Sequence, residues 1–172
     1  MKPNVSVIIP VYNTEKLLSR CLQTVTEQSL TNIEIICVND GSTDNSLDVL
    51  QKWADKDNRI VVINQANGRQ GKARNAAMAV AKGEYIGMID SDDYIPANYF
   101  EKLYNAAVTN NAEIAICGII KEKPAGNRTV IEFKESTVAT TTQEKLQVCK
   151  CPPEFHPVNK LYSKEMLERI GL

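Results

Sequence analysis

Three carboxylates follow a short apolar run in the middle of the chain. Residues 85–89 carry no charge, and Asp90, Asp92 and Asp93 come directly after them. Carboxylates this close repel one another unless a cation, hydrogen-bond donors or open solvent compensates their charge. Hard divalent cations that carry phosphates are bound by one or two carboxylates, while water and phosphate oxygens complete the shell. The pattern therefore predicts a metal–phosphate site.

An alternation of strand-like and helix-like segments would position this acidic turn. Apolar runs predict strands at 5–11, 33–38, 60–63, 85–89 and 113–119. Capping residues and helical spacing predict helices after Thr14, after Asp44, at 72–81 and at 96–109. Such repeats predict an α/β fold, with a Rossmann-like, mostly parallel sheet and helices on both faces, in a single domain. Ligands bind at the carboxyl ends of strands in these sheets, which is where the acidic turn falls.

The alternation stops near residue 120. Residues 129–133 have the pattern of an antiparallel edge strand, and short helices are expected at 143–150 and 162–170. Three prolines in 152–157 enforce extended chain between those helices. We therefore expect an α/β part at 1–120 and a different, shorter region at 121–172.

Composition excludes several classes of partner. The chain has 172 residues and a formal net charge of −1, without a basic block, so nucleic acid is not expected to be the main partner. No apolar run approaches the roughly 20 residues that cross a bilayer. The N-terminus has no signal-peptide pattern, so we expect a cytoplasmic protein. Peripheral association with the inner face of a membrane, and the oligomeric state, stay open.

The five cysteines are expected to be free thiols. Cys149 and Cys151 form a C-x-C pair near His156, the single histidine of the chain. A zinc site needs about four ligands, usually with wider cysteine spacing, so a metal site at these three residues is the less favoured alternative.

Four segments together resemble the family 2 glycosyltransferases. They are Val-Ser-Val-Ile-Ile-Pro-Val-Tyr-Asn at 5–13, Glu-Ile-Ile-Cys-Val-Asn-Asp-Gly-Ser-Thr-Asp at 34–44, Gly-Lys-Ala-Arg-Asn at 71–75 and Asp-Ser-Asp-Asp at 90–93. The likeness extends to Asn-Lys-Leu-Tyr at 159–162. A lone D-x-D pair is weak, but four motifs in the same order and spacing are specific.

The resemblance implies a GT-A fold, a nucleotide-diphosphate-sugar donor such as a UDP-sugar, Mn²⁺ or Mg²⁺, and inversion at the anomeric carbon. It also implies a glycan or lipid-linked acceptor in the synthesis of a surface polysaccharide. By the same resemblance, Asp40 accepts a hydrogen bond from the base, Arg74 lies near the base and phosphates, Asp90 contacts the ribose or metal-bound water, and Asp92 ligates the metal. The residues so implied to bind substrate are Pro10, Val11, Tyr12, Asn13, Asp40, Arg74, Asp90 and Ser91, and the implied metal ligands are Asp92 and Asp90.

Physical chemistry supports two of these roles. A nucleotide base offers N–H donors, and an ionised aspartate such as Asp40 is a pure acceptor. Gly41 permits the tight turn that would present this acceptor. A metal at Asp92 would neutralise the charge that develops on a departing diphosphate.

The general base is the missing part. Inverting transfer to a hydroxyl needs one, and in the resembling family it is commonly the Glu-Asp pair that follows a segment like this C-terminus. The sequence contains no Glu-Asp pair. We therefore expect 1–120 to be the donor-binding subdomain and 121–172 the start of a truncated acceptor-side region, with the base beyond residue 172. Asp93 and Glu154 are weaker candidates for this base. The alternative function is a non-catalytic or truncated nucleotide-sugar binding domain.

Simpler interpretations exist for the same residues. Asp90 and Asp92 could cap the helix near Pro96, Asp40 could form an ordinary turn, and Arg74 could be a solvated helix residue. Among other enzymes, a phosphotransferase would carry its D-x-D after the first strand. Dinucleotide-binding enzymes and P-loop NTPases would need glycine motifs that the sequence lacks.

Overall fold

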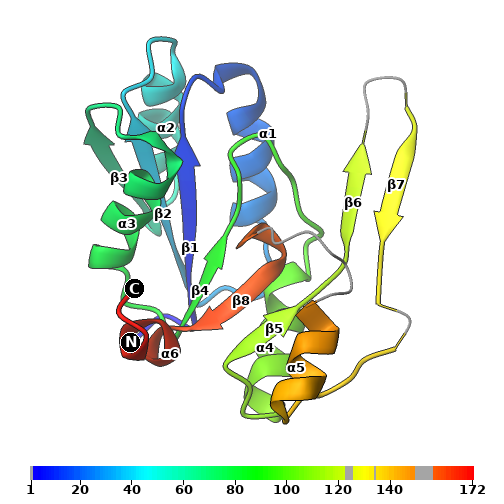
Figure 1. Cartoon of the computed structure of the whole chain (residues 1–172). Helices are drawn as coiled ribbons and strands as arrows, with labels where there is room; N and C mark the ends of the chain where they lie inside the picture. Colours follow the sequence, from blue (N-terminus) through cyan, green and yellow to red (C-terminus); the bar gives the residue numbers. More distant parts are fainter. Residues whose placement is uncertain (1, 123–125, 134, 150–156) are drawn as a thin grey trace.

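A six-stranded, mainly parallel sheet forms the centre of the molecule (Figure 1). The computed structural model describes residues 2–122, 126–133, 135–149 and 157–172. In spatial order the strands are β3 (Ile60–Gln65), β2 (Ile33–Asp40), β1 (Val5–Val11), β4 (Tyr85–Met88), β8 (Lys160–Ser163) and β5 (Ile114–Ile116). The β3–β2–β1–β4 neighbours pair in parallel, and β8 pairs antiparallel with both β4 and β5. The predicted α/β class is confirmed.

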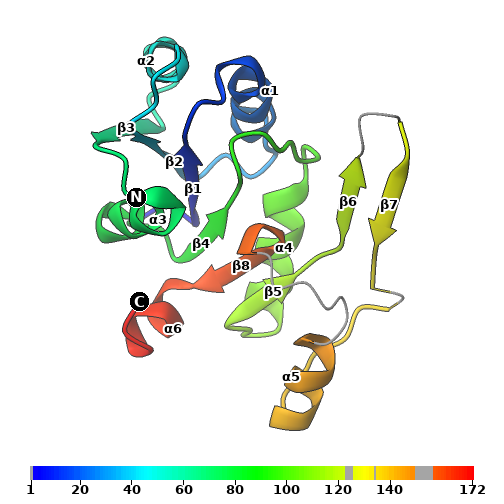
Figure 2. The same ribbon diagram turned by 45° about the horizontal axis from the view of Figure 1, so that its top comes forward.

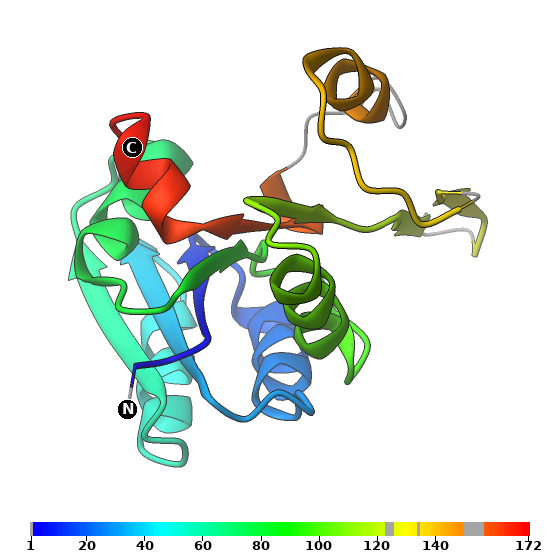
Figure 3. The same cartoon turned by 90° about the horizontal axis from the view of Figure 1, so that it is seen from below.

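Helices cover both faces of this sheet, as predicted (Figure 3). The first face carries α1 (Glu15–Thr26), α2 (Ser46–Ala54) and α4 (Tyr99–Thr109), and the second carries α3 (Arg69–Val80) and α6 (Lys164–Arg169). Every residue of β1 is buried, because the strand lies between β2 and β4 and helices cover both faces of the sheet at this position. Val7 and Ile9 face the first helical layer, whereas Ile8 faces the second. This explains why β1 has an unbroken apolar sequence.

The chain after α4 departs from the predicted pattern in three places. The strand expected at 113–119 is split into β5 and β6 (Ile119–Glu122), and Gly118 lies at the break. A Cβ on Gly118 would clash with the carbonyl oxygen of Ile131. The strand expected at 129–133 is β7 (Arg128–Ile131), but it pairs with β6 in a separate two-stranded sheet that stands away from the main one (Figure 2). The helix expected at 162–170 is present as α6, but it begins at Lys164, because Tyr162 and Ser163 belong to the strand β8.

Smaller differences concern helix boundaries. The helix α3 begins at Arg69, within the segment expected to be a loop, and α4 begins three residues after Pro96. A further helix, α5 (Thr142–Cys149), agrees with the expected 143–150 except for Lys150, which lies outside the described residues. A 3₁₀ turn, η1 (Pro157–Asn159), leads into β8.

The free-thiol and membrane expectations are tested only within the described part of the chain. Cys21, Cys37 and Cys117 are free, whereas Cys151 and His156 lie outside the described residues. No helix in the described ranges is long and apolar enough to span a bilayer.

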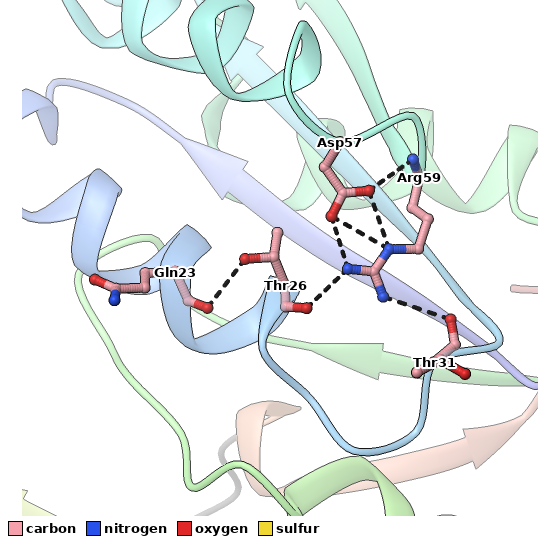
Figure 4. A network of polar contacts seen from close by, with 5 residues as sticks. All are labelled: Gln23, Thr26, Thr31, Asp57 and Arg59. Carbon is pink, nitrogen blue, oxygen red and sulfur yellow. Dashed lines mark hydrogen bonds and ion pairs between the residues drawn. The ribbon is translucent and has the colours of Figure 1, made fainter.

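An arginine ties three loops together at the amino-terminal end of the parallel strands (Figure 4). Arg59 Nη2 donates to Asp57 Oδ2 at 2.6 Å and to the carbonyl oxygen of Thr26 at 2.7 Å, and its Nη1 donates to the carbonyl oxygen of Thr31 at 3.4 Å. The hydrogen bonds from Arg59 hold the pKa of Asp57 below its usual value. This network joins the end of α1, the loop before β2 and the loop before β3.

We expect Asp57→Asn to lower the free energy of unfolding by about 1–3 kcal/mol at neutral pH, because the hydrogen bonds from Arg59 then end on a neutral amide instead of a carboxylate. The carboxylate pKa is lowered in the folded state. Its contribution is therefore present above the unfolded value near 4 and is lost as the pH falls through the folded value. Urea unfolding at pH 7, 4 and 2.5 should show the stability difference between the two proteins shrinking in acid. A difference that stays constant with pH would contradict the assignment, and Asp55→Asn, an exposed acid, is the control.

Candidate functional site

A cavity of about 530 Å³ opens at the carboxyl edge of the parallel strands. Four segments meet there: the end of β1, the end of β2, the turn into α3 and the turn after β4. The lining residues are Pro10, Val11, Tyr12, Asp40, Asn67, Arg69, Gln70, Asp90, Ser91 and Asp92. The sheet order explains the convergence, because β2 and β4 flank β1 on its two sides.

Asp40 is a buried acceptor at one end of the cavity. It is the last residue of β2 and only 3% exposed. Its Oδ1 accepts hydrogen bonds from Gln65 Nε2 at 2.7 Å and from the backbone N–H of Gly68 at 2.9 Å. Both donors bind the same oxygen, so Oδ2 is the atom available to a ligand. The next residue, Gly41, has a φ of +71° and begins the turn.

Asp90 lies at the other end and is held by α3. Its Oδ1 accepts from Gln70 Nε2 at 2.8 Å and from Arg74 Nη2 at 2.8 Å. Arg74 is therefore an ion-pair partner of Asp90, and it is not among the residues that line the cavity. The guanidinium offsets part of the charge that Asp90 and Asp92 place side by side.

The backbone of the acidic turn is fixed from α1, while the side chain of Asp92 is exposed. The carbonyl oxygen of Asp92 accepts from Arg20 Nη2 at 3.1 Å, and Ser91 Oγ accepts from Thr14 Oγ1 at 3.1 Å. The Cys21 thiol donates to the carbonyl oxygen of Asp90 at 3.6 Å. Burial, with the nearby acids, raises the pKa of Cys21 to about 12, so this thiol stays protonated.

Asn13 connects two turns and is not among the lining residues. It adopts a φ of +52°, a conformation that asparagine tolerates better than most residues. Its Oδ1 accepts from the backbone N–H of Thr43 at 2.8 Å, and its own N–H donates to Ser42 Oγ at 3.1 Å. The structure thus places Asn13 on the exposed surface, where it joins the turn after β1 to the turn after β2.

The donor set suits a hard divalent cation that is shared with a ligand. Within the described residues, no group of three or more acidic, cysteine or histidine side chains could hold a metal by itself. Asp90 and Asp92 nevertheless line one cavity, and Mg²⁺-type sites use one or two carboxylates together with substrate phosphates and water. The residues therefore fit a cation that arrives with, or is completed by, a phosphate ligand.

Three lining residues were not found from the sequence: Asn67, Arg69 and Gln70. They belong to a turn whose sequence predicts only a loop. Their placement depends on the hydrogen bond from Gly68 to Asp40 and on the early start of α3. The glycine and asparagine content of this turn was the single available signal.

The fold and the cavity define a class: an α/β protein with an acidic ligand site at the carboxyl edge of its sheet, of the GT-A type. The model of one family, described as glycosyl transferase family 2, matches residues 6–171. The chain therefore belongs to glycosyl transferase family 2, and the family expected from the four motifs is confirmed.

Relatives in sequence are named as glycosyltransferases. The uncharacterized glycosyltransferase EpsJ of Bacillus subtilis is 36% identical over 176 residues, which cover 100% of this chain and 51% of EpsJ. The poly(ribitol-phosphate) beta-glucosyltransferase of Bacillus spizizenii is 43% identical over 116 residues, covering 65% of this chain and 18% of that protein. The chain thus spans about half the length of EpsJ and much less of the second relative.

Solved structures share the fold. Residues 1–349 of S. aureus TarS, in complex with UDP-GlcNAc, superpose with a TM-score of 0.83 at 27% identity, covering 97% of this chain and 47% of that one. The mannosyltransferase PcManGT from Pyrobaculum calidifontis, in complex with GDP-Man and Mn²⁺, gives a TM-score of 0.70 at 22% identity, over 99% of this chain and 47% of that chain. The second likeness concerns the fold alone.

Proposed function

We propose that this chain forms the donor site of an inverting glycosyltransferase that uses a UDP-sugar and Mn²⁺ or Mg²⁺. One observation carries the proposal: a single cavity holds a buried aspartate acceptor at one end and the D-x-D pair at the other. A nucleoside diphosphate has the matching order of groups, with an N–H donor on its base and a diphosphate beyond the ribose. The TarS complex with UDP-GlcNAc supports the choice of donor.

The base end of the cavity is suited to uracil. Asp40 Oδ2 can accept the imide N–H, because Gln65 and Gly68 occupy Oδ1. Tyr12 is 51% exposed beside it and offers an aromatic face for stacking on the base. Pro10 and Val11 complete the wall at the end of β1.

The phosphate end is suited to a metal-bound diphosphate. Asp92 and Asp90 would hold the cation, which supplies charge neutralisation on the leaving diphosphate when it is bound. Arg74 and Gln70 keep the Asp90 carboxylate oriented by their two hydrogen bonds to Oδ1. The contacts from α1 to Ser91 and to the Asp92 backbone keep the turn in place.

For the acceptor, we infer a glycan or a lipid-linked molecule in the synthesis of a surface polysaccharide, on the cytoplasmic side and in peripheral contact with the membrane. The poly(ribitol-phosphate) beta-glucosyltransferase among the relatives supports a polymeric acceptor. The expectation that the general base lies beyond residue 172 stays a prediction.

A thermal-shift measurement with Asp92→Asn tests the donor site. At a hundred times its Kd, UDP with Mn²⁺ adds about 2.7 kcal/mol to stability. For a chain of this size, that raises the Tm by roughly 5–10 °C. Asp92→Asn should reduce the shift to about 1–2 °C, because the exposed carboxylate can ligate metal and makes no hydrogen bond or ion pair with the described residues. Asp55→Asn, an exposed acid outside the cavity, is the matched control and should retain the full shift.

The outcomes separate the alternatives. A shift with UDP and Mn²⁺ that Asp92→Asn removes supports the donor site. A shift without turnover, even when acceptor-side sequence is present, would favour the nucleotide-sugar binding module. No shift with any nucleoside diphosphate, in the presence of either metal, would refute the donor site itself.

A further inference from the structure

Arg69 lines the cavity with a backbone conformation that is unfavourable for an arginine. Its φ is +68°, in the left-handed region, where a side chain with a Cβ is destabilised relative to glycine. The glycines on either side of it, Gly68 and Gly71, do not use positive φ values. The chain therefore carries arginine at the one position of this turn where glycine would be more stable. Such local conflicts are concentrated at functional sites.

The side chain of Arg69 is not committed to the protein. Among the described residues, its guanidinium has neither a hydrogen-bond acceptor nor an ion-pair partner, and the residue is exposed. It is also the sole cation among the cavity-lining residues, which include the acids Asp40, Asp90 and Asp92. Arg74, the other arginine of the region, is already paired with Asp90 at 2.8 Å.

The neighbours of Arg69 fix its place in the cavity. Gly68 donates its backbone N–H to Asp40 at the base end, and Gln70 donates its side chain to Asp90 at the metal end. Arg69 therefore lies between the two ends. A nucleotide that reaches from Asp40 to Asp92 must pass this residue with its ribose and phosphates.

We infer that Arg69 binds the diphosphate of the donor and that its strained backbone is the cost of placing a guanidinium there. The inference rests on the proposed function. A guanidinium forms two parallel hydrogen bonds to phosphate oxygens and stays charged at every relevant pH. It would add positive charge beside the diphosphate, which the D-x-D residues do not supply.

Two variants separate charge from strain. Arg69→Gln removes the charge and keeps a Cβ, so the Tm of the free protein should stay within about 1 °C. Arg69→Gly removes both, so its Tm should rise by roughly 1–4 °C. Both should weaken UDP binding in Mn²⁺ by roughly 10- to 100-fold, the effect of losing a charge-assisted contact. Lys72→Ala removes an exposed cation one turn along α3 that does not line the cavity, and it should leave UDP affinity within about twofold.

Isothermal titration with UDP, UMP and uridine locates the contact. Arg69→Gln should lose most affinity for UDP, less for UMP, and almost none for uridine. If the wild type binds UDP and Arg69→Gln binds it equally well, the inference is refuted while the donor site stands. An equal loss for UDP and uridine would also refute it, because the contact would then be with the nucleoside. If the wild type does not bind UDP, the proposed function fails and this inference falls with it.

Discussion

Replacing Gly41 by alanine should lower the free energy of unfolding by about 2–5 kcal/mol and damage the nucleotide site at the same time. Gly41 has a φ of +71°, which costs a residue with a Cβ about 1–2 kcal/mol. The introduced Cβ would also lie 2.6 Å from the backbone nitrogen of Asn67, and overpacking of this kind costs about 1–3 kcal/mol. Since the contact is with backbone, rotation of a side chain cannot relieve it.

Gly41→Ala should also weaken nucleotide binding, because Asn67 is one of the residues that line the cavity. A shift of this backbone would weaken the hydrogen bond from Gly68 to Asp40, which orients the buried acceptor. We expect a Tm lower by roughly 5–15 °C, measured by calorimetry, and a loss of most UDP affinity at a temperature where the variant is folded. Gly71→Ala is the control, because Gly71 has no atom within 4 Å of its potential Cβ and lies in α3. It should be neutral or slightly stabilising. A Gly41→Ala protein as stable as the wild type would refute the close approach of these two turns.

The strands that carry the site could be predicted because their signal is local. The residues of β1 are buried on both faces of the sheet, so an unbroken apolar run marks the strand. Asp40 and Asp90 follow two such runs, and parallel strands place their carboxyl ends at one edge. The convergence of Asp40, Asp90 and Asp92 on one cavity was therefore accessible from sequence.

The strand β8 could not be predicted because its formation depends on distant pairing. Its four residues, Lys160–Ser163, include one fully buried side chain, Leu161, and no alternating pattern. The strand exists because it fills the position between β4 and β5, which is a non-local effect. The helix predicted at 162–170 is therefore confirmed only from Lys164 onward, since its first two residues belong to β8.

The details of the site escaped prediction for a different reason. The donors to Asp40 are a side-chain amide and a backbone N–H, and every residue except proline carries the latter. The pairing of Arg74 with Asp90 depends on where α3 begins, which sequence reasoning placed at residue 72 instead of Arg69. Helix boundaries are the feature that is hardest to predict from a sequence. Here the start of α3 lies about one turn earlier than predicted, and this difference decides which side chains line the cavity.

Asp40→Asn should reverse the preference of the site from uracil to cytosine while leaving the fold intact. Gln65 and Gly68 both donate to Oδ1, and the amide oxygen of the new side chain can accept the same two bonds. Stability should therefore change by less than about 1 kcal/mol. The atom that faces the ligand changes from a charged acceptor to an N–H donor. Uracil presents an N–H at its third ring position, which would then meet a donor. Cytosine presents an unprotonated nitrogen there, which can accept.

Competition titrations with UDP and CDP in Mn²⁺ measure this reversal. We expect UDP affinity to fall by roughly 100-fold, because a charge-assisted bond is replaced by two opposed donors, and CDP affinity to rise. Intact mass should be checked, since the new Asn-Gly sequence can deamidate back to aspartate. Asp92→Asn is the matched comparison: it should weaken both nucleotides equally, because the metal contacts the diphosphate that they share. If Asp40→Asn also weakens both equally, Asp40 does not contact the base. Its role would then be to hold the turn through Gln65 and Gly68.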